Sequence, residues 1–166
     1  MSMENIRIAN IADLERITEI YNQAVLSKFE TADTVEFESK DRMDWFYSHP
    51  QDTYPIFVYE LNGAVVGWVS ISPYRCGRKA LRFTAEISYY VHADFKHKGI
   101  GSKLVKHVLD NAETLNFKTL FAIILDKNTA SINLLKKYGF TEWGHMPDVA
   151  DFDGEECGHV YYGRKI

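Results

Sequence analysis

The stretch VHADFKHKGIGSKLV, Val91 to Val105, decides the fold, because it joins an apolar strand pattern to a helical pattern through two glycines. The first N–H groups of a helix have no partner inside the helix, and the helix dipole favours negative charge beside them. Gly99 and Gly101 would let an anion approach the backbone closely, while Lys96 and Lys98 would add positive charge. The stretch therefore predicts either a site for a phosphate-like anion or a simple strand-to-helix turn with solvated lysines.

Around this stretch, the apolar periodicity predicts a mixed α/β protein. Asn62-Gly63 is expected to join two β-rich runs as a two-residue hairpin turn, because both residues tolerate a positive φ angle. Ser39 is expected to cap a short helix, and Asn128 to cap a helix that ends near Gly139. The other expected elements are strands at Ile6–Ile8, Phe83–Val91, Thr119–Leu125 and Gly158–Ile166, a helix at Ile11–Leu26, and a helix of about 15 residues after Gly101. This order predicts an antiparallel first half and a βαβαβ-like second half.

Length and composition limit the possible classes of protein. The chain has 166 residues, which suits a single domain over residues 1–166, and its net charge of -4 argues against a nucleic-acid-binding module. It has no apolar run long enough to span a membrane, so neither nucleic acid nor membrane is an expected partner. The six histidines lack metal-ligand spacing, and no metal is expected. Cys76 and Cys157 lie far apart behind a start without an export signal, which indicates a cytoplasmic protein with free thiols.

Two motifs resemble one known family. VHADFKHKGIGSKLV is similar to the pyrophosphate-binding motif of the GNAT superfamily of acetyl-CoA-dependent N-acetyltransferases, Arg/Gln-x-x-Gly-x-Gly/Ala. Downstream, NTASINLLKKYGF, Asn128 to Phe140, resembles the family's second cofactor segment, in which an Asn opens a helix that ends in Gly-Phe. The segments IYNQAVL, TADTVEFE, RMDWF and RFTAEISYYV look like the branch that acetylates phosphinothricin and methionine sulfoximine. The resemblance therefore covers nearly the whole chain.

The resemblance implies the acyl-CoA N-acyltransferase fold, with a mixed, mostly antiparallel and V-splayed sheet of about seven strands flanked by about four helices. Strands Phe83–Val91 and Thr119–Leu125 would part to admit the pantetheine arm of acetyl-CoA. A homodimer is also implied. The cofactor-binding residues that the resemblance implies are Tyr90, Val91, Lys96, His97, Lys98, Gly99, Ile100, Gly101, Ser102, Asn128 and Ser131.

Two positions depart from the family pattern. Lys96 replaces the customary Arg or Gln at the head of the first motif, and phosphate binding is expected to survive because backbone amides carry much of that contact. Leu135 stands where many members carry a Tyr that protonates the leaving thiolate. Tyr138, one turn further on, is the remaining candidate among side chains for the catalytic acid, and water is the alternative.

Glu86 is the candidate catalytic base. Acetyl transfer requires an unprotonated amine, so a proton acceptor must lie within reach of the amine, directly or through a water. Glu86 shares the polar face of its expected strand with Ser88 and Tyr90, and it matches the Glu of the Thr-x-Glu segment in the amino-acid-acetylating branch. The alternative interpretation is a carboxylate on a solvated strand face.

Arg78 and Arg82 are the candidate substrate ligands, because guanidinium groups bind carboxylates and phosphinates in a bidentate manner and the resembling branch has arginine at both places. An exposed charged run is the alternative. Phe29 and Thr34 fall in a loop that often covers the substrate in this family. These residues favour direct acetyl transfer to a small amino acid or analogue in a ternary complex. Acetylation of a protein N-terminus, a lysine or a polyamine, and a non-catalytic acyl-CoA-binding sensor, remain alternatives.

Overall fold

The computed structural model describes residues 2–166, which form a seven-stranded sheet with helices on both faces. The strands are β1 (Glu4–Ile8), β2 (Ile56–Leu61), β3 (Ala64–Pro73), β4 (Thr84–Val91), β5 (Thr119–Leu125), β6 (Thr141–Phe152) and β7 (Glu155–Lys165). The α-helices are α1 (Leu14–Ser27), α2 (Met43–Tyr47), α3 (Ile100–Asn111) and α4 (Thr129–Lys137). The mixed α/β class predicted from the sequence is confirmed.

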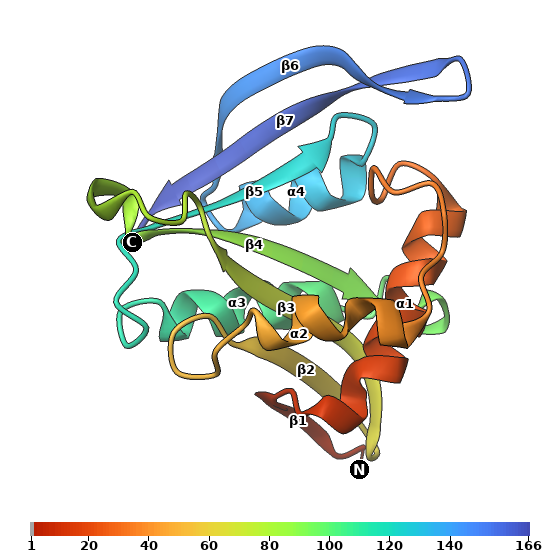
Figure 1. Ribbon diagram of the computed structural model, residues 1–166, viewed down its shortest axis with the longest axis vertical. Coiled ribbons are helices and arrows are strands. Elements are labelled where there is room, and N and C mark those ends of the chain that lie inside the picture. The colour runs from red at the N-terminus through yellow and green to blue at the C-terminus, as the bar shows by residue number, and fades with distance from the viewer. Residues whose placement is uncertain (1) are drawn as a thin grey trace.

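The strand order is β1-β2-β3-β4-β5-β7-β6 (Figure 1). Among the strands of the described residues, every neighbouring pair is antiparallel except β4 and β5, which run parallel. This parallel pairing extends only from Thr84–Thr119 to Glu86–Phe121, and beyond it the two strands diverge (Figure 1). The V-shaped splay expected between these two strands is therefore present, and it begins at Glu86.

The two faces of the sheet have separate hydrophobic cores, because successive strand residues point to opposite faces. On one face, Ile56 and Val58 of β2 pack in a core with residues of α1 and α2. On the other, Phe57 and Tyr59 belong to a core that includes residues of α3 and α4. Helices α1 and α2 thus cover one face and α3 and α4 the other (Figure 1).

Several local predictions are confirmed. Asn62 and Gly63 have φ angles of 51° and 82° in the turn between β2 and β3. The Asn128 side chain caps α4, accepting a hydrogen bond from the Ser131 amide at 3.2 Å. Gly139, just after α4, has a φ of 77°, the left-handed conformation that commonly follows a helix.

Two local predictions are wrong in detail. Ser39 does not cap its helix: it is the first residue of a 3-10 helix, Ser39–Arg42, whose N-cap is Glu38 without a side-chain hydrogen bond. Helix α3 has 12 residues rather than about 15. Beyond Asn111 the chain turns back, with the Phe117 amide donating to the Ala112 carbonyl at 2.8 Å, so the last apolar residues of the pattern pack from a turn.

Cys76 is exposed, Cys157 is buried, and both are free, as the sequence predicts. In residues 2–166 each helix is too short or too polar to cross a membrane. The same residues contain no cluster of three or more His, Cys, Asp or Glu side chains placed to hold a metal ion.

Candidate functional site

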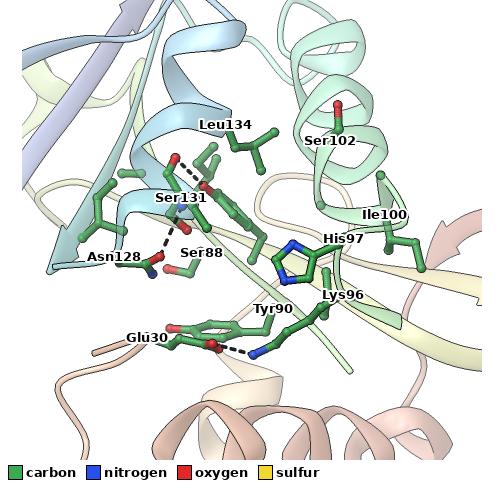
Figure 2. A pocket seen from close by; sticks show the side chains of 18 of the residues that line it. Glu30, Ser88, Tyr90, Lys96, His97, Ile100, Ser102, Asn128, Ser131 and Leu134 are labelled. Carbon is green, nitrogen blue, oxygen red and sulfur yellow. Dashed lines mark hydrogen bonds and ion pairs between the residues drawn. The ribbon is translucent and has the colours of Figure 1, made fainter. Parts of the chain in front are cut away.

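A groove of about 360 Å³ lies where β4 and β5 part (Figure 2). Residues of β4 and β5 from both sides of the splay line it, together with residues from the start of α3 and of α4. Of the residues predicted to bind a cofactor, all but Lys98 line this groove. The lining residues are Glu30, Ile87–Val91, Phe95–His97, Gly99–Ser102, Ala122–Ile124, Asn128, Ala130, Ser131 and Leu134.

The start of α3 offers backbone donors to the groove. His97 and Gly99 have φ angles of 61° and 79°, so the chain passes through two left-handed residues before it enters the helix. The first amide groups of α3 have no acceptor inside the helix. A Cβ atom on Gly101 would lie 3.3 Å from Cδ2 of Leu134, so glycine lets α3 and α4 come together here. Unpaired amides beside a groove are suited to an anionic ligand.

Two lysines of this turn differ in their surroundings. The Lys96 ammonium lies in the groove and pairs with the Glu30 carboxylate at 2.5 Å (Figure 2). The Lys98 ammonium instead donates to the Asp94 carbonyl at 2.9 Å and does not line the groove. The Lys98 side chain is therefore directed away from the groove, and a contact of Lys98 with the cofactor through its backbone amide stays a prediction.

The opposite wall of the groove comes from α4 and β4. Asn128 and Ser131 face the groove from the first turn of α4 (Figure 2). The Tyr89 hydroxyl is 3.5 Å from the Ser131 carbonyl, and burial raises the pKa of Tyr89 to about 12. This phenol therefore stays protonated at neutral pH.

A second pocket of about 340 Å³ adjoins the groove. Ser88 and Tyr90 of β4 line both cavities, so the two meet at the outer half of this strand. The other residues that line the second pocket are Tyr21, Asp33, Phe37, Asp41, Arg42, Trp45, Trp68, Ser70, Ser72 and Glu86.

Glu86 is the carboxylate that β4 contributes to the second pocket. It lies at the point where β4 leaves β5, two residues before Ser88 and on the same face of the strand. Burial raises the pKa of the Glu86 carboxyl, with no hydrogen bond acting against it. A carboxylate that is partly withdrawn from water is a better proton acceptor near neutral pH than an exposed one.

The sequence matches the Acetyltransferase (GNAT) family over residues 14–140. The chain belongs to this family. It is 37% identical over 144 residues to the L-methionine sulfoximine/L-methionine sulfone acetyltransferase of Salmonella typhimurium, covering 87% of this chain and 84% of that protein. It is 36% identical over 145 residues to the L-amino acid N-acyltransferase of Escherichia coli, with 87% and 84% coverage.

A crystal structure of a GNAT superfamily phosphinothricin acetyltransferase from Sinorhizobium meliloti in complex with AcCoA superposes on this GNAT acetyltransferase with a TM-score of 0.91. The two chains are 29% identical, and the match covers 98% of this chain and 88% of the other. The fold, the recognised family and the enzyme class expected from the sequence are therefore confirmed.

Four residues predicted to bind the acetyltransferase's substrate lie outside both cavities. Arg82 Nη1 donates to the Lys79 carbonyl at 2.7 Å, its guanidinium lies over the Phe83 ring, and like Arg78 it is on the exposed link between β3 and β4. Phe29 packs against Phe152 with ring centres 5.1 Å apart. Thr34 is exposed. The loop that carries the last two contributes Glu30 and Asp33 to the cavities instead.

Tyr138 is not next to Glu86. Its hydroxyl is hydrogen-bonded to Ser102 Oγ at 2.6 Å, at the start of α3, and the residue lines neither cavity. Leu135 is fully buried in the core under α3. The side chains of α4 therefore bring no acidic group to the place where the two cavities meet.

Sequence reasoning missed Arg42, which lines the second pocket and is buried. It ends the 3-10 helix Ser39–Arg42, three residues before Trp45. Neighbours three apart on a helix contact each other, so the Arg-x-x-Trp spacing was the available signal. Burial of the arginine follows from packing against Tyr21 and Trp68, which are distant in sequence.

Proposed function

We propose that this acetyltransferase moves the acetyl group of acetyl-CoA to the amine of a small amino acid or analogue. The relatives support this acceptor class, because their names specify L-methionine sulfoximine, L-methionine sulfone and L-amino acids. The similar structure that holds AcCoA supports the donor. An acceptor of the phosphinothricin or methionine sulfoximine type is consistent with the names of these relatives and of this structure.

One observation carries the proposal: the groove and the second pocket share Ser88 and Tyr90. A thioester at that end of the groove would meet an amine held in the second pocket. Both substrates could then be bound together, and the acetyl group would pass directly between them in a ternary complex without an acetylated enzyme residue.

The groove has suitable groups for each part of the donor. The free amides from His97 to Ser102 would hold the pyrophosphate, and Lys96 would exchange Glu30 for a phosphate oxygen. Lys98 would contribute its backbone amide only. The backbone of Tyr90 and Val91 would bind the pantetheine, with Asn128 and Ser131 on the far side.

Glu86 acts as the base in this proposal. Acetyl-CoA supplies an activated thioester, so the enzyme must deprotonate the amine and stabilise the charge that develops on the carbonyl oxygen. Glu86 accepts the amine proton, directly or through a water, and a backbone N–H near Val91 donates to the oxyanion. The raised pKa of Glu86 supports this role.

Tyr90 is a better candidate than Tyr138 for the acid that protonates the thiolate. Tyr90 lines both cavities, whereas Tyr138 lines neither. Burial raises the pKa of Tyr90, which keeps the phenol protonated but makes it a weaker acid, so its position supports this role and its pKa does not. Tyr138 would instead position Ser102 beside the pyrophosphate through their hydrogen bond.

Polyamine acetylation is a second candidate, because an acidic hollow borders the second pocket. The hollow shares Phe37 with that pocket. Its carboxylates come from Glu15, Glu19, Glu36 and Glu38. A hollow of this charge is suited to a cationic acceptor.

A thiol-release assay with acetyl-CoA separates these functions. The panel contains phosphinothricin, methionine sulfoximine, neutral amino acids, spermidine and a peptide with a free N-terminus. We expect turnover with the amino acids and their analogues. Faster turnover with spermidine or the peptide would contradict the proposal, and binding of acetyl-CoA without turnover on any amine would favour a non-catalytic sensor.

We also propose that two copies pair through the β6–β7 hairpin. Trp143, Met146 and Val149 of β6 are all about half exposed, at 51%, 47% and 51%, which leaves three large apolar side chains accessible on the edge strand of the sheet. Light scattering should give twice the 19.2 kDa mass of the chain. A single-chain mass at micromolar concentration would argue against the dimer.

A further inference from the structure

Arg42 is the only cation among the described side chains that line the second pocket. It is 7% exposed, and its Nη1 atom has no hydrogen-bond partner within residues 2–166. Burial lowers the pKa of its guanidinium, because water no longer solvates the charge. A buried donor without an acceptor is destabilising, so the fold retains this group at a cost in free energy.

Four aromatic rings surround the guanidinium and form a cage. Its carbon lies 4.0 Å from the ring centre of Trp45 and 4.4 Å from that of Tyr21, with Phe37 and Trp68 each at 5.8 Å. Ring faces stabilise a cation, but they provide no oxygen acceptor for its N–H groups. The cage therefore fixes Arg42 in place without satisfying its hydrogen bonds.

The charges in the pocket are complementary to a zwitterion. Three carboxylates, those of Glu86, Asp33 and Asp41, line it together with Arg42, and Asp33 also accepts a hydrogen bond from the Tyr21 hydroxyl. An amino acid has an amine and an oxyanion a few bonds apart. The carboxylates suit the amine end, and the guanidinium suits the oxyanion.

We propose that Arg42 binds an oxyanion of the acetyl acceptor and thereby holds the acceptor amine toward Glu86. This inference rests on the proposed function in one respect, namely that the second pocket receives the acceptor. It replaces Arg78 and Arg82, which line neither cavity. The oxyanion can be the α-carboxylate or an acidic group on the side chain, since both offer a pair of oxygen acceptors to the guanidinium.

The test compares kcat/KM for phosphinothricin, which has both oxyanions, its α-carboxamide, and methionine, whose side chain is neutral. Arg42→Met should lower kcat/KM for phosphinothricin by about 10- to 150-fold, the effect of a charge-assisted hydrogen bond. The loss should lie mainly in KM for the acceptor, with KM for acetyl-CoA unchanged. Lys40→Met removes an exposed cation of the same 3-10 helix and should change neither constant.

The acceptor that lacks the relevant oxyanion should show no penalty. If Arg42→Met leaves kcat/KM for the carboxamide unchanged, Arg42 binds the α-carboxylate. If it leaves kcat/KM for methionine unchanged, Arg42 binds the acidic side-chain group. An equal loss for all three acceptors would overturn the inference and make Arg42 a structural residue. If Arg42→Met does not fold, Arg42→Lys decides by the same comparison, because it keeps the charge but loses the planar pair of donors.

A titration without turnover separates the inference from the proposed function. Trp45 and Trp68 adjoin Arg42, so their fluorescence should change when phosphinothricin binds. If the wild-type enzyme acetylates no amino acid, the proposed function fails. Arg42 is then judged by this titration alone: weaker binding to Arg42→Lys than to wild type supports the inference, and equal binding overturns it.

Discussion

Glu86→Gln should separate activity from stability. Glutamine has the shape of the glutamate side chain but cannot accept the amine proton. Because burial raises the pKa of Glu86 and no hydrogen bond offsets it, the substitution removes a desolvated charge and breaks no polar contact of that carboxyl. We therefore expect an enzyme that folds at least as well as wild type and turns over far more slowly.

The expected loss in kcat/KM is about 100- to 10,000-fold, the usual contribution of a positioned proton acceptor. This corresponds to about 2.7–5.5 kcal/mol of transition-state stabilisation. Stability should move the other way. When the pKa of a carboxyl is raised in the folded state, the free energy of unfolding falls as pH rises through that pKa. At neutral pH the glutamine variant should therefore resist unfolding slightly better than wild type.

Two measurements check this pair of effects. Steady-state kinetics across pH should show an acidic limb of kcat/KM in wild type, at a pH above the ordinary range of glutamate, and that limb should be absent from Glu86→Gln. Thermal unfolding at pH 7 should show a Tm no lower than wild type. Full activity of Glu86→Gln with an unchanged pH profile would refute the assignment of Glu86 as the base. A lowered Tm together with the lowered activity would mean that the variant lost activity because its fold was destabilised.

Three further predictions concern the groove and the core. Gly101→Val should raise KM for acetyl-CoA by at least about tenfold in steady-state assays, because a Cβ atom there already lies 3.3 Å from Leu134. A KM for acetyl-CoA equal to that of wild type would contradict this prediction for Gly101→Val. By contrast, Gly99 has a φ of 79° and no atom near its Cβ position, so Gly99→Ala should lower the unfolding free energy in urea by about 1–2 kcal/mol. Leu135→Tyr overfills a fully buried site and should cost about 1–3 kcal/mol in urea unfolding without raising kcat; a gain in kcat would revive α4 as the source of the acid. Burial alone would raise the pKa of Asp13, but its bonds to Arg7 and to the Asn10 backbone together outweigh burial and lower it. Wild type should therefore lose stability as pH falls below about 4, and Arg7→Met should show a smaller loss in Tm measured across pH.

Local chemistry predicted much of the fold. The Asn62-Gly63 turn, the Asn128 cap and Gly139 each depend on a residue type that satisfies one backbone requirement, so short motifs were sufficient. Apolar periodicity predicted the strand ending at Val91, because alternation is also a pattern within one short segment. The divergence of β4 and β5 after Glu86 depends on pairing between distant segments, and family resemblance rather than periodicity indicated it.

The candidate site was predicted less evenly. The glycine turn was recognisable because both its backbone donors and its glycines belong to one stretch of chain. Arg42 was not, because its burial depends on rings from α1 and β3 that enclose it only in the folded protein. Arg82 lies on an exposed loop, over Phe83, and its contact with the substrate stays a prediction.

A crystal structure of the protein with CoA and an N-acetylated amino acid would test the central claim most directly. The account predicts CoA in the groove between β4 and β5, and the product in the second pocket. The acetyl group should lie beside Ser88 and Tyr90, with its nitrogen within reach of Glu86 directly or through one water. Product bound on the Arg78–Arg82 loop, or beyond reach of Glu86, would contradict it.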